Sequence, residues 1–81
     1  MPYSLNMLKK GEACTVINVN GEGPFIRRLF DMGITPGVVI IIKRIAPLGD
    51  PMQITLRGYD LIIRKKDAKM IDIELLNPRE R

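Results

Sequence analysis

The chain has 81 residues, of which 46% are hydrophobic, so there is room for one globular domain with a single core. One cysteine and no histidine are present, which excludes an internal disulfide and any site built on imidazole groups. The net charge of +4 comes from 13 basic and 9 acidic residues that alternate in small groups along the chain, which predicts a solvated surface and no nucleic-acid partner.

The first segments predict a helical turn and a strand. Residues 4–10 are expected to form one turn of helix, and residues 12–20 a strand. Within this strand Val16, Ile17 and Val19 cannot all face one way, so a β-bulge is expected.

A short amphipathic helix follows the turn at residues 20–23. Pro24 suits the first helical position. Apolar residues spaced three and four apart are expected to share one face of the helix: Phe25, Ile26, Leu29, Phe30 and Met32. Gly33 is expected to end the helix, and the Pro36-Gly37 turn leads into the next strand. A short helix between the strands of so small a chain predicts a small barrel with a helical plug.

The second half of the sequence predicts four more strands, at residues 38–45, 52–57, 60–65 and 70–75. Two prolines exclude regular pairing in residues 46–51, which predicts a loop. Gly58-Tyr59 predicts a tight hairpin with a type II′ turn. Residues 38–42 carry apolar side chains on both faces, so the outward ones need cover from the neighbouring helix or from a second copy of the chain.

These elements predict a mainly β fold in a single domain of residues 1–76. The first choice is a small SH3-like barrel of about five antiparallel strands with one short α-helix inserted after the first strand, and an OB-like barrel is the alternative. Closure of the sheet would remove exposed edges. Residues 77–81 are expected to form a frayed tail.

The sequence contains no constellation of residues that would support catalysis. Cys14, the only thiol, is interpreted as a small hydrophobe at a half-buried strand position. Asp72 and Glu74 share one face of a strand, which is typical of a solvated acidic pair. The phosphate-binding pattern of nucleotide hydrolases is absent. We therefore expect no enzyme activity, no cofactor and no metal, and a protein that acts by contact.

Several blocks occur in a fixed order between about Leu5 and Leu75. The more specific ones are Arg28-Leu29-x-Asp31-Met32-Gly33-Ile34-x-Pro36-Gly37 and Ala46-Pro47-Leu48-Gly49-Asp50-Pro51, and they are followed by Arg57-Gly58-Tyr59-x-Leu61-x-Ile63-Arg64. In this order and spacing the sequence resembles the ferrous iron transport protein A (FeoA) family. The resemblance implies an SH3-like barrel of the cytoplasm that binds and modulates the ferrous iron permease FeoB, which has a GTP-binding domain and a membrane channel.

Two segments are the candidate contact surface for such a permease. The helix offers Arg27, Arg28 and Asp31, and the proline-bounded loop offers Pro47, Leu48, Gly49 and Asp50, with Leu48 as an apolar anchor. Arg28 and Asp31 are also spaced to pair with each other, an effect of about 0.3–0.5 kcal/mol. The expected location is the cytoplasm, at the inner face of the membrane through the partner, with no membrane span. A nucleic-acid-binding or self-associating barrel is the alternative.

Overall fold

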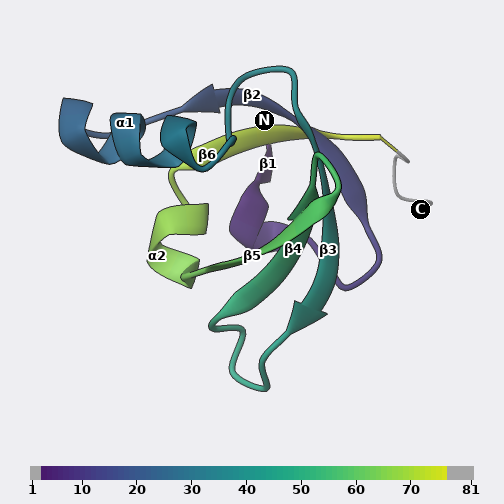
Figure 1. Ribbon diagram of the computed structural model, residues 1–81. Helices are drawn as coiled ribbons and strands as arrows, with labels where there is room; N and C mark the ends of the chain where they lie inside the picture. Colours follow the sequence, from purple (N-terminus) through teal and green to yellow (C-terminus); the bar gives the residue numbers. More distant parts are fainter. Residues whose placement is uncertain (1–2, 77–81) are drawn as a thin grey trace.

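The computed structural model describes residues 3–76, and its strands form one antiparallel sheet in the order β1-β6-β2-β3-β4-β5 (Figure 1). The strands are β1 Tyr3–Ser4, β2 Ala13–Val19, β3 Val39–Ile45, β4 Met52–Leu56, β5 Tyr59–Ile63 and β6 Ile71–Leu75. The helices are a 3₁₀ turn η1 at Leu5–Met7, α1 at Gly23–Asp31 and α2 at Lys65–Ala68. The predicted tail at residues 77–81 lies outside the described residues.

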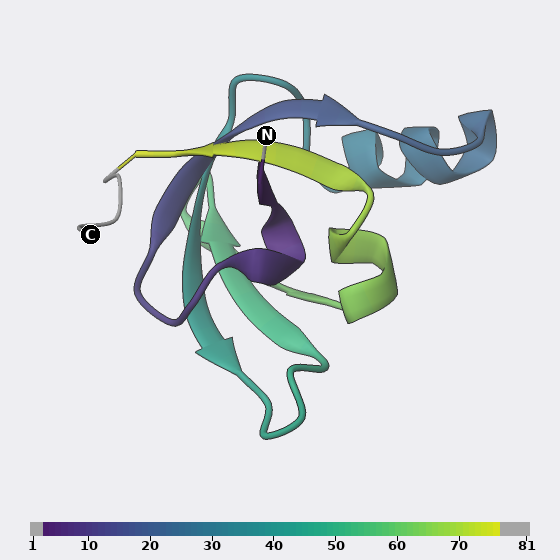
Figure 2. The ribbon, with the colours of Figure 1, turned by 180° about the vertical axis from the view of Figure 1, so that it is seen from behind.

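The hydrophobic core lies inside the curled sheet. Strict alternation in β4 buries Met52, Ile54 and Leu56, while Gln53 and Thr55 lie on the other face. Strands β3 and β6 bury Ile40, Ile42, Ile71 and Ile73 in the same way. The 3₁₀ turn and α2 complete this core with Leu5 and Ala68, and Figure 2 shows both helical turns on the concave side of the sheet. Each fully buried large side chain contributes roughly 1.5–3 kcal/mol.

The predicted bulge in β2 is confirmed. The register against β6 shifts between Val16 and Asn18, so that one residue is left unpaired. The residue at the shift, Ile17, is 49% exposed, while Val16 and Val19 on either side are buried.

Helix α1 projects from the sheet, so the expectation of a plug is wrong (Figures 1 and 2). Side chains from the strands, η1 and α2 already fill the interior, and α1 buries only Leu29 completely. Phe30, expected on the buried face, is 42% exposed. The predicted end of the helix is confirmed, because Gly33 has φ +93° and the Ile34 N–H donates to the Leu29 carbonyl at 3.0 Å.

The hairpin between β4 and β5 turns one residue earlier than expected. Leu56 pairs with Tyr59, and the two residues between them, Arg57 and Gly58, have φ +50° and +86°. Positive φ at both central positions defines a type I′ turn, not the predicted II′ turn. Its twist matches that of the flanking strands, which offsets the cost of Arg57 in a left-handed conformation.

The number of strands and the closure of the sheet also differ from expectation. A sixth strand, β1, pairs Tyr3 and Ser4 with Ile73 and Asp72 of β6, where a helical turn from residue 4 was predicted. Among the described residues, the terminal strands β1 and β5 do not pair with each other, so the sheet keeps its edges. Among residues 3–76, no helix is both long enough and apolar enough to cross a bilayer.

Candidate functional site

The polar side of α1 carries the first predicted contact segment. Arg27, Arg28 and Asp31 are exposed and line a shallow hollow on the outer side of the helix. Arg28 does not pair with Asp31 as expected, because its Nη2 lies 3.5 Å from Oδ2 of Asp67 in α2. The Asp67 side chain is only 17% exposed, and at such a site the attraction of a cation is less screened than at a fully solvated one. The Arg28 guanidinium also lies 5.5 Å from the centre of the Phe25 ring.

The second predicted segment, the loop at residues 46–51, has a defined shape. The Gly49 N–H donates to the Ala46 carbonyl at 2.8 Å, and the Ala46 N–H donates to the Pro51 carbonyl at 3.0 Å. Leu48 projects from this loop with 89% of its surface exposed, and Pro47 beside it is exposed as well. An apolar side chain at a fixed loop tip is available for contact without any rearrangement.

Asp50 forms a hydrogen bond to another element of the fold. Its Oδ1 accepts the backbone N–H of Lys65, the first residue of α2, at 2.9 Å. A carboxylate at the start of a helix satisfies a free donor there and interacts favourably with the helix dipole. Asp50 thereby joins the loop to α2.

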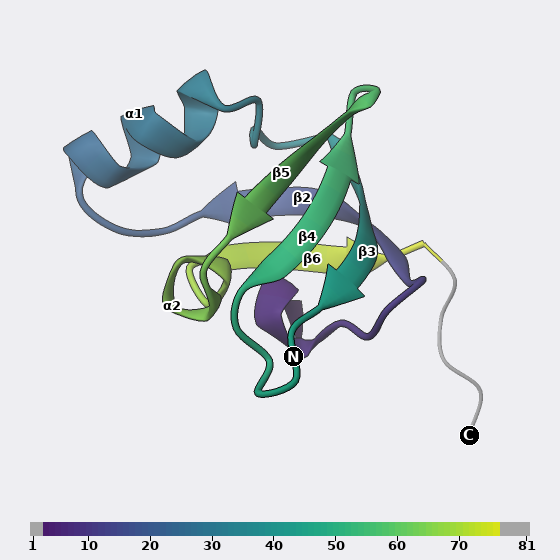
Figure 3. The ribbon, with the colours of Figure 1, turned by 60° about the horizontal axis from the view of Figure 1, so that its bottom comes forward.

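Helix α2 connects the two predicted segments. α1 and the loop lie apart on the molecule, with α2 between them (Figures 1 and 3). Arg28–Asp67 connects α2 to α1, and Asp50–Lys65 connects it to the loop. The candidate surface therefore runs from α1 across α2 to the loop. The exposed basic residues Lys65 and Lys66 of α2 belong to this surface, although they were not predicted from the sequence.

A groove of about 450 Å³ lies between α1, the end of β5 and α2. It is lined by Phe25, Arg28, Met32, Ile62, Ile63, Arg64, Lys66 and Asp67. Ile62 is 62% exposed, the highest exposure of a large hydrophobic residue in the sheet. The sequence held a signal for it, since alternation that turns Leu61 and Ile63 inward turns Ile62 outward. We call this feature, with its eight lining residues, the basic groove.

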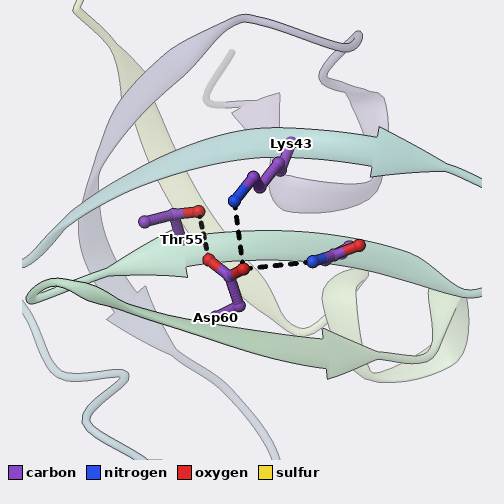
Figure 4. A network of polar contacts seen from close by, with 4 residues as sticks. Lys43, Thr55 and Asp60 are labelled. Carbon is purple, nitrogen blue, oxygen red and sulfur yellow. Dashed lines mark hydrogen bonds and ion pairs between the residues drawn. The ribbon is translucent and has the colours of Figure 1, made fainter.

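A polar network holds the outer face of the sheet around Asp60 (Figure 4). Its carboxylate accepts hydrogen bonds from Thr55 Oγ1 at 2.7 Å, Lys43 Nζ at 3.1 Å and Gln53 Nε2 at 3.2 Å. The Thr55 hydrogen bond, followed by that from Lys43, lowers the pKa of Asp60 below its ordinary value of 3.8. The network joins β3, β4 and β5, so we interpret it as structural.

The remaining reactive groups do not form a chemical site. Cys14 is fully buried, and burial raises the pKa of its thiol to about 11, so it is protonated at neutral pH. Within residues 3–76 no group of three or more acidic or thiol side chains is arranged to hold a metal ion.

Fold and surface together define a small antiparallel β domain whose distinctive exposed features are a basic groove and an apolar loop tip. The chain belongs to the FeoA family, because the model of the FeoA domain matches residues 3–75. It is 33% identical over 73 residues to a Fe(2+) transport protein A/Fe(2+) transporter FeoB fusion protein of Porphyromonas gingivalis. That match covers 90% of this chain but only 9% of the length of the relative.

Solved structures place the fold among FeoA proteins. The structure of a FeoA-like protein from Clostridium acetobutylicum superposes with a TM-score of 0.88 at 38% identity, covering 99% of this chain and 93% of that one. A FeoA of Stenotrophomonas maltophilia, complexed with zinc and described as a prokaryotic SH3 domain protein, matches with a TM-score of 0.77 over 89% of each chain. At 20% identity the second likeness concerns the fold alone, and it confirms the SH3-like architecture.

Proposed function

We propose that this protein is an accessory, non-enzymatic module of ferrous iron uptake that acts in the cytoplasm by binding the cytoplasmic part of a FeoB-type permease, including its GTPase region. The carrying observation is the P. gingivalis relative, in which a domain similar to this chain is joined to FeoB in one polypeptide. Such a fusion keeps two modules at high effective concentration, which favours a contact between them. Ferrous iron is then the cargo of the partner and not a ligand of this chain.

The exposed groups of the candidate surface suit docking. Leu48 offers an exposed apolar side chain, and α1 and α2 place cations on either side of the basic groove. Arg27, Arg28 and Asp31 on α1, with Pro47, Leu48, Gly49 and Asp50 on the loop, are the proposed partner-binding residues. Of these, Arg28 and Asp50 also hold α2 in place, so their effect on binding has to be separated from their effect on the fold.

Co-purification with the cytoplasmic part of the permease tests the proposal. Leu48→Asp is expected to weaken capture without changing the free energy of unfolding, because the side chain is almost fully exposed. Unchanged capture by the folded Leu48→Asp variant would exclude the loop from the contact, and no capture of the permease by the wild-type protein would overturn the proposed function.

A charge swap separates the two roles of Arg28. Arg28→Glu alone removes the ion pair with Asp67 and is expected to weaken capture. In the double variant Arg28→Glu with Asp67→Arg, the internal pair is restored with its sign reversed. Capture that returns with the internal pair would mean that Arg28 acts only through the fold, whereas capture that stays weak supports a direct contact.

Self-association is a second candidate, favoured by one observation. Val39 and Ile41 on the outer face of β3 are each 44% exposed, so α1 does not cover them. Sedimentation over a range of concentrations tests this candidate, with Ile41→Lys as the comparison. A mass that rises with concentration in the wild type but not in Ile41→Lys would support it, and a constant monomer mass would reject it.

A further inference from the structure

Strand β5 is an edge of the sheet with free backbone groups. It stands last in the strand order, and within residues 3–76 it pairs on one side only, with β4. In an antiparallel hairpin with a two-residue turn, the residues of the closing pair, Leu56 and Tyr59, are bonded to each other, and bonded and non-bonded pairs then alternate. The peptide groups of Asp60 and Ile62 therefore point away from β4. Among the described residues, no backbone hydrogen bond outside the β4–β5 ladder involves either of them.

The basic groove lies along this free edge. Ile62, Ile63 and Arg64 form its β5 side, and α1 and α2 supply the rest. Figure 3 shows β5 at the margin of the sheet, running toward α2, with α1 on the same side of the molecule. The groove thus combines unpaired strand backbone with apolar side chains, which are the two elements of peptide recognition by strand addition.

The charges of the basic groove favour an acidic partner. Arg28, Arg64 and Lys66 line it, against the single carboxylate of Asp67, which is already paired with Arg28. This leaves an excess of positive charge beside the exposed Ile62. A segment with apolar residues at one end and acidic residues at the other would be complementary, with its apolar residues against Ile62 and Met32 and its carboxylates toward Arg64 and Lys66.

We propose that an extended acidic segment of the protein partner adds to the sheet along the free edge of β5, with its side chains in the basic groove. The proposal rests on the proposed function, because it specifies how the permease would be held. It differs from the surface predicted by sequence in that β5, and not α1 or the loop, carries the main-chain contacts. An exposed isoleucine on an open edge otherwise favours aggregation. Basic residues that flank an edge strand also oppose its pairing with another copy of the chain. The test has to separate these roles.

Amide hydrogen exchange measured by NMR is the direct test. Isotope-labelled protein is examined alone and with the cytoplasmic part of the FeoB-type permease. In a second arm, a short synthetic peptide with Val residues followed by Glu residues is used as the probe, and the same peptide with Lys in place of Glu is its control. We expect the Ile62 amide to slow by about tenfold or more on binding, since a new hydrogen bond must open before exchange. The Leu61 amide, which faces β4 in the free protein, should change much less.

Charge variants provide the second measurement. Arg64→Glu with Lys66→Glu should weaken binding of the Glu and Val peptide by about tenfold or more and remove most of its salt dependence. Arg44→Glu with Lys9→Glu makes the same change in net charge at exposed positions outside the basic groove, and it should leave the affinity nearly unchanged. Urea unfolding of each variant shows that the fold is retained.

Each outcome decides a different question. Capture of the permease with no slowing at Ile62 would reject strand addition while the proposed function stands. Equal affinity of both charge variants would reject the role given to Arg64 and Lys66. Slowing at Ile62 in concentrated protein without any partner would assign the edge to a second copy of this chain and overturn the proposal. Equal binding of the Glu and Lys peptides would reject the acidic partner.

Discussion

At the scale of single residues, Gly33 combines two constraints at the end of α1. Its φ of +93° is a conformation that side chains with a Cβ adopt at a cost of roughly 1–2 kcal/mol. A Cβ at this position would also collide with the hydroxyl of Tyr59, which donates a hydrogen bond to the Met32 carbonyl. Glycine is therefore required for backbone geometry and for space.

Comparing two glycine substitutions separates these constraints. Gly37 has a similar φ of +94°, but a Cβ there would meet no atom within 4 Å. Gly37→Ala should cost only the backbone term, while Gly33→Ala should also displace the Tyr59 hydroxyl and lose its hydrogen bond, which costs a further roughly 0.5–1.5 kcal/mol. Urea unfolding measures both. The Tyr59→Phe change, which removes the hydroxyl, should recover part of the Gly33→Ala loss, and equal losses for the two glycines would contradict the steric argument.

Asp60 predicts a pH dependence of stability. Its folded-state pKa lies below the ordinary value of 3.8, so the carboxylate contributes stability that is fully present above that pH and is lost as the pH falls through the folded pKa. Asp60→Asn should unfold at lower urea concentration than the wild type at pH 7, and this gap should narrow as the solution is acidified toward pH 3. Asp31→Asn makes the same change in charge on α1 and serves as the control. A gap that stays constant with pH would show that the Asp60 carboxylate is not stabilised by its Thr55 and Lys43 partners.

At the scale of elements, α1 is only weakly attached to the core. Only Leu29 of its nine residues is fully buried, whereas β4 buries three of five. Local opening is easiest where few apolar contacts must be broken. The amides of α1 should therefore exchange with solvent faster than those of β2, β3 and β4, by a route that does not need global unfolding. Hydrogen exchange at increasing low concentrations of urea checks this, and protection in α1 equal to that of the central strands would contradict it.

The sequence carried enough information for those elements whose conformation depends on near neighbours. The bulge at Ile17, the end of α1 at Gly33 and the alternation in β4 all follow from local patterns, and all three are confirmed. Features that depend on distant contacts could not be read in this way. Strand β1 has two residues and exists because β6 is beside it, and Arg28 pairs with Asp67, which is 39 positions away in the chain (67 − 28 = 39).

The candidate site likewise contains one feature that a local pattern predicts and one that depends on contacts between distant residues. The exposure of Leu48 follows from the prolines on either side of it, which exclude regular pairing of the loop. The basic groove is formed by α1, β5 and α2, which are separated in sequence, and its depth depends on how α1 leaves the sheet. No local pattern gives that angle, because it results from the packing of Leu29 against the rest of the core.

At the scale of the whole molecule, the distribution of charge argues for a protein partner over a nucleic acid. The 13 basic residues are interrupted by 9 acidic ones, and two of the cations, Arg28 and Lys43, are paired with Asp67 and Asp60. The described aromatic residues with substantial exposure, Tyr3, Phe30 and Tyr59, come from three separate elements or their ends. A single-stranded nucleic acid requires cations along one path and aromatic faces for stacking.

Filter binding therefore gives a prediction for the intact protein. At physiological salt we expect no retention of single-stranded or double-stranded DNA or RNA, and at low salt only the weak retention that a net charge of +4 produces. The Arg64→Glu with Lys66→Glu variant, whose net charge becomes zero (4 − 4 = 0), should abolish the weak retention. Retention by the wild type that is tight at physiological salt and falls steeply with added salt would reverse this ranking. Such a slope arises when cations gathered along one path neutralise many phosphates and release their counterions.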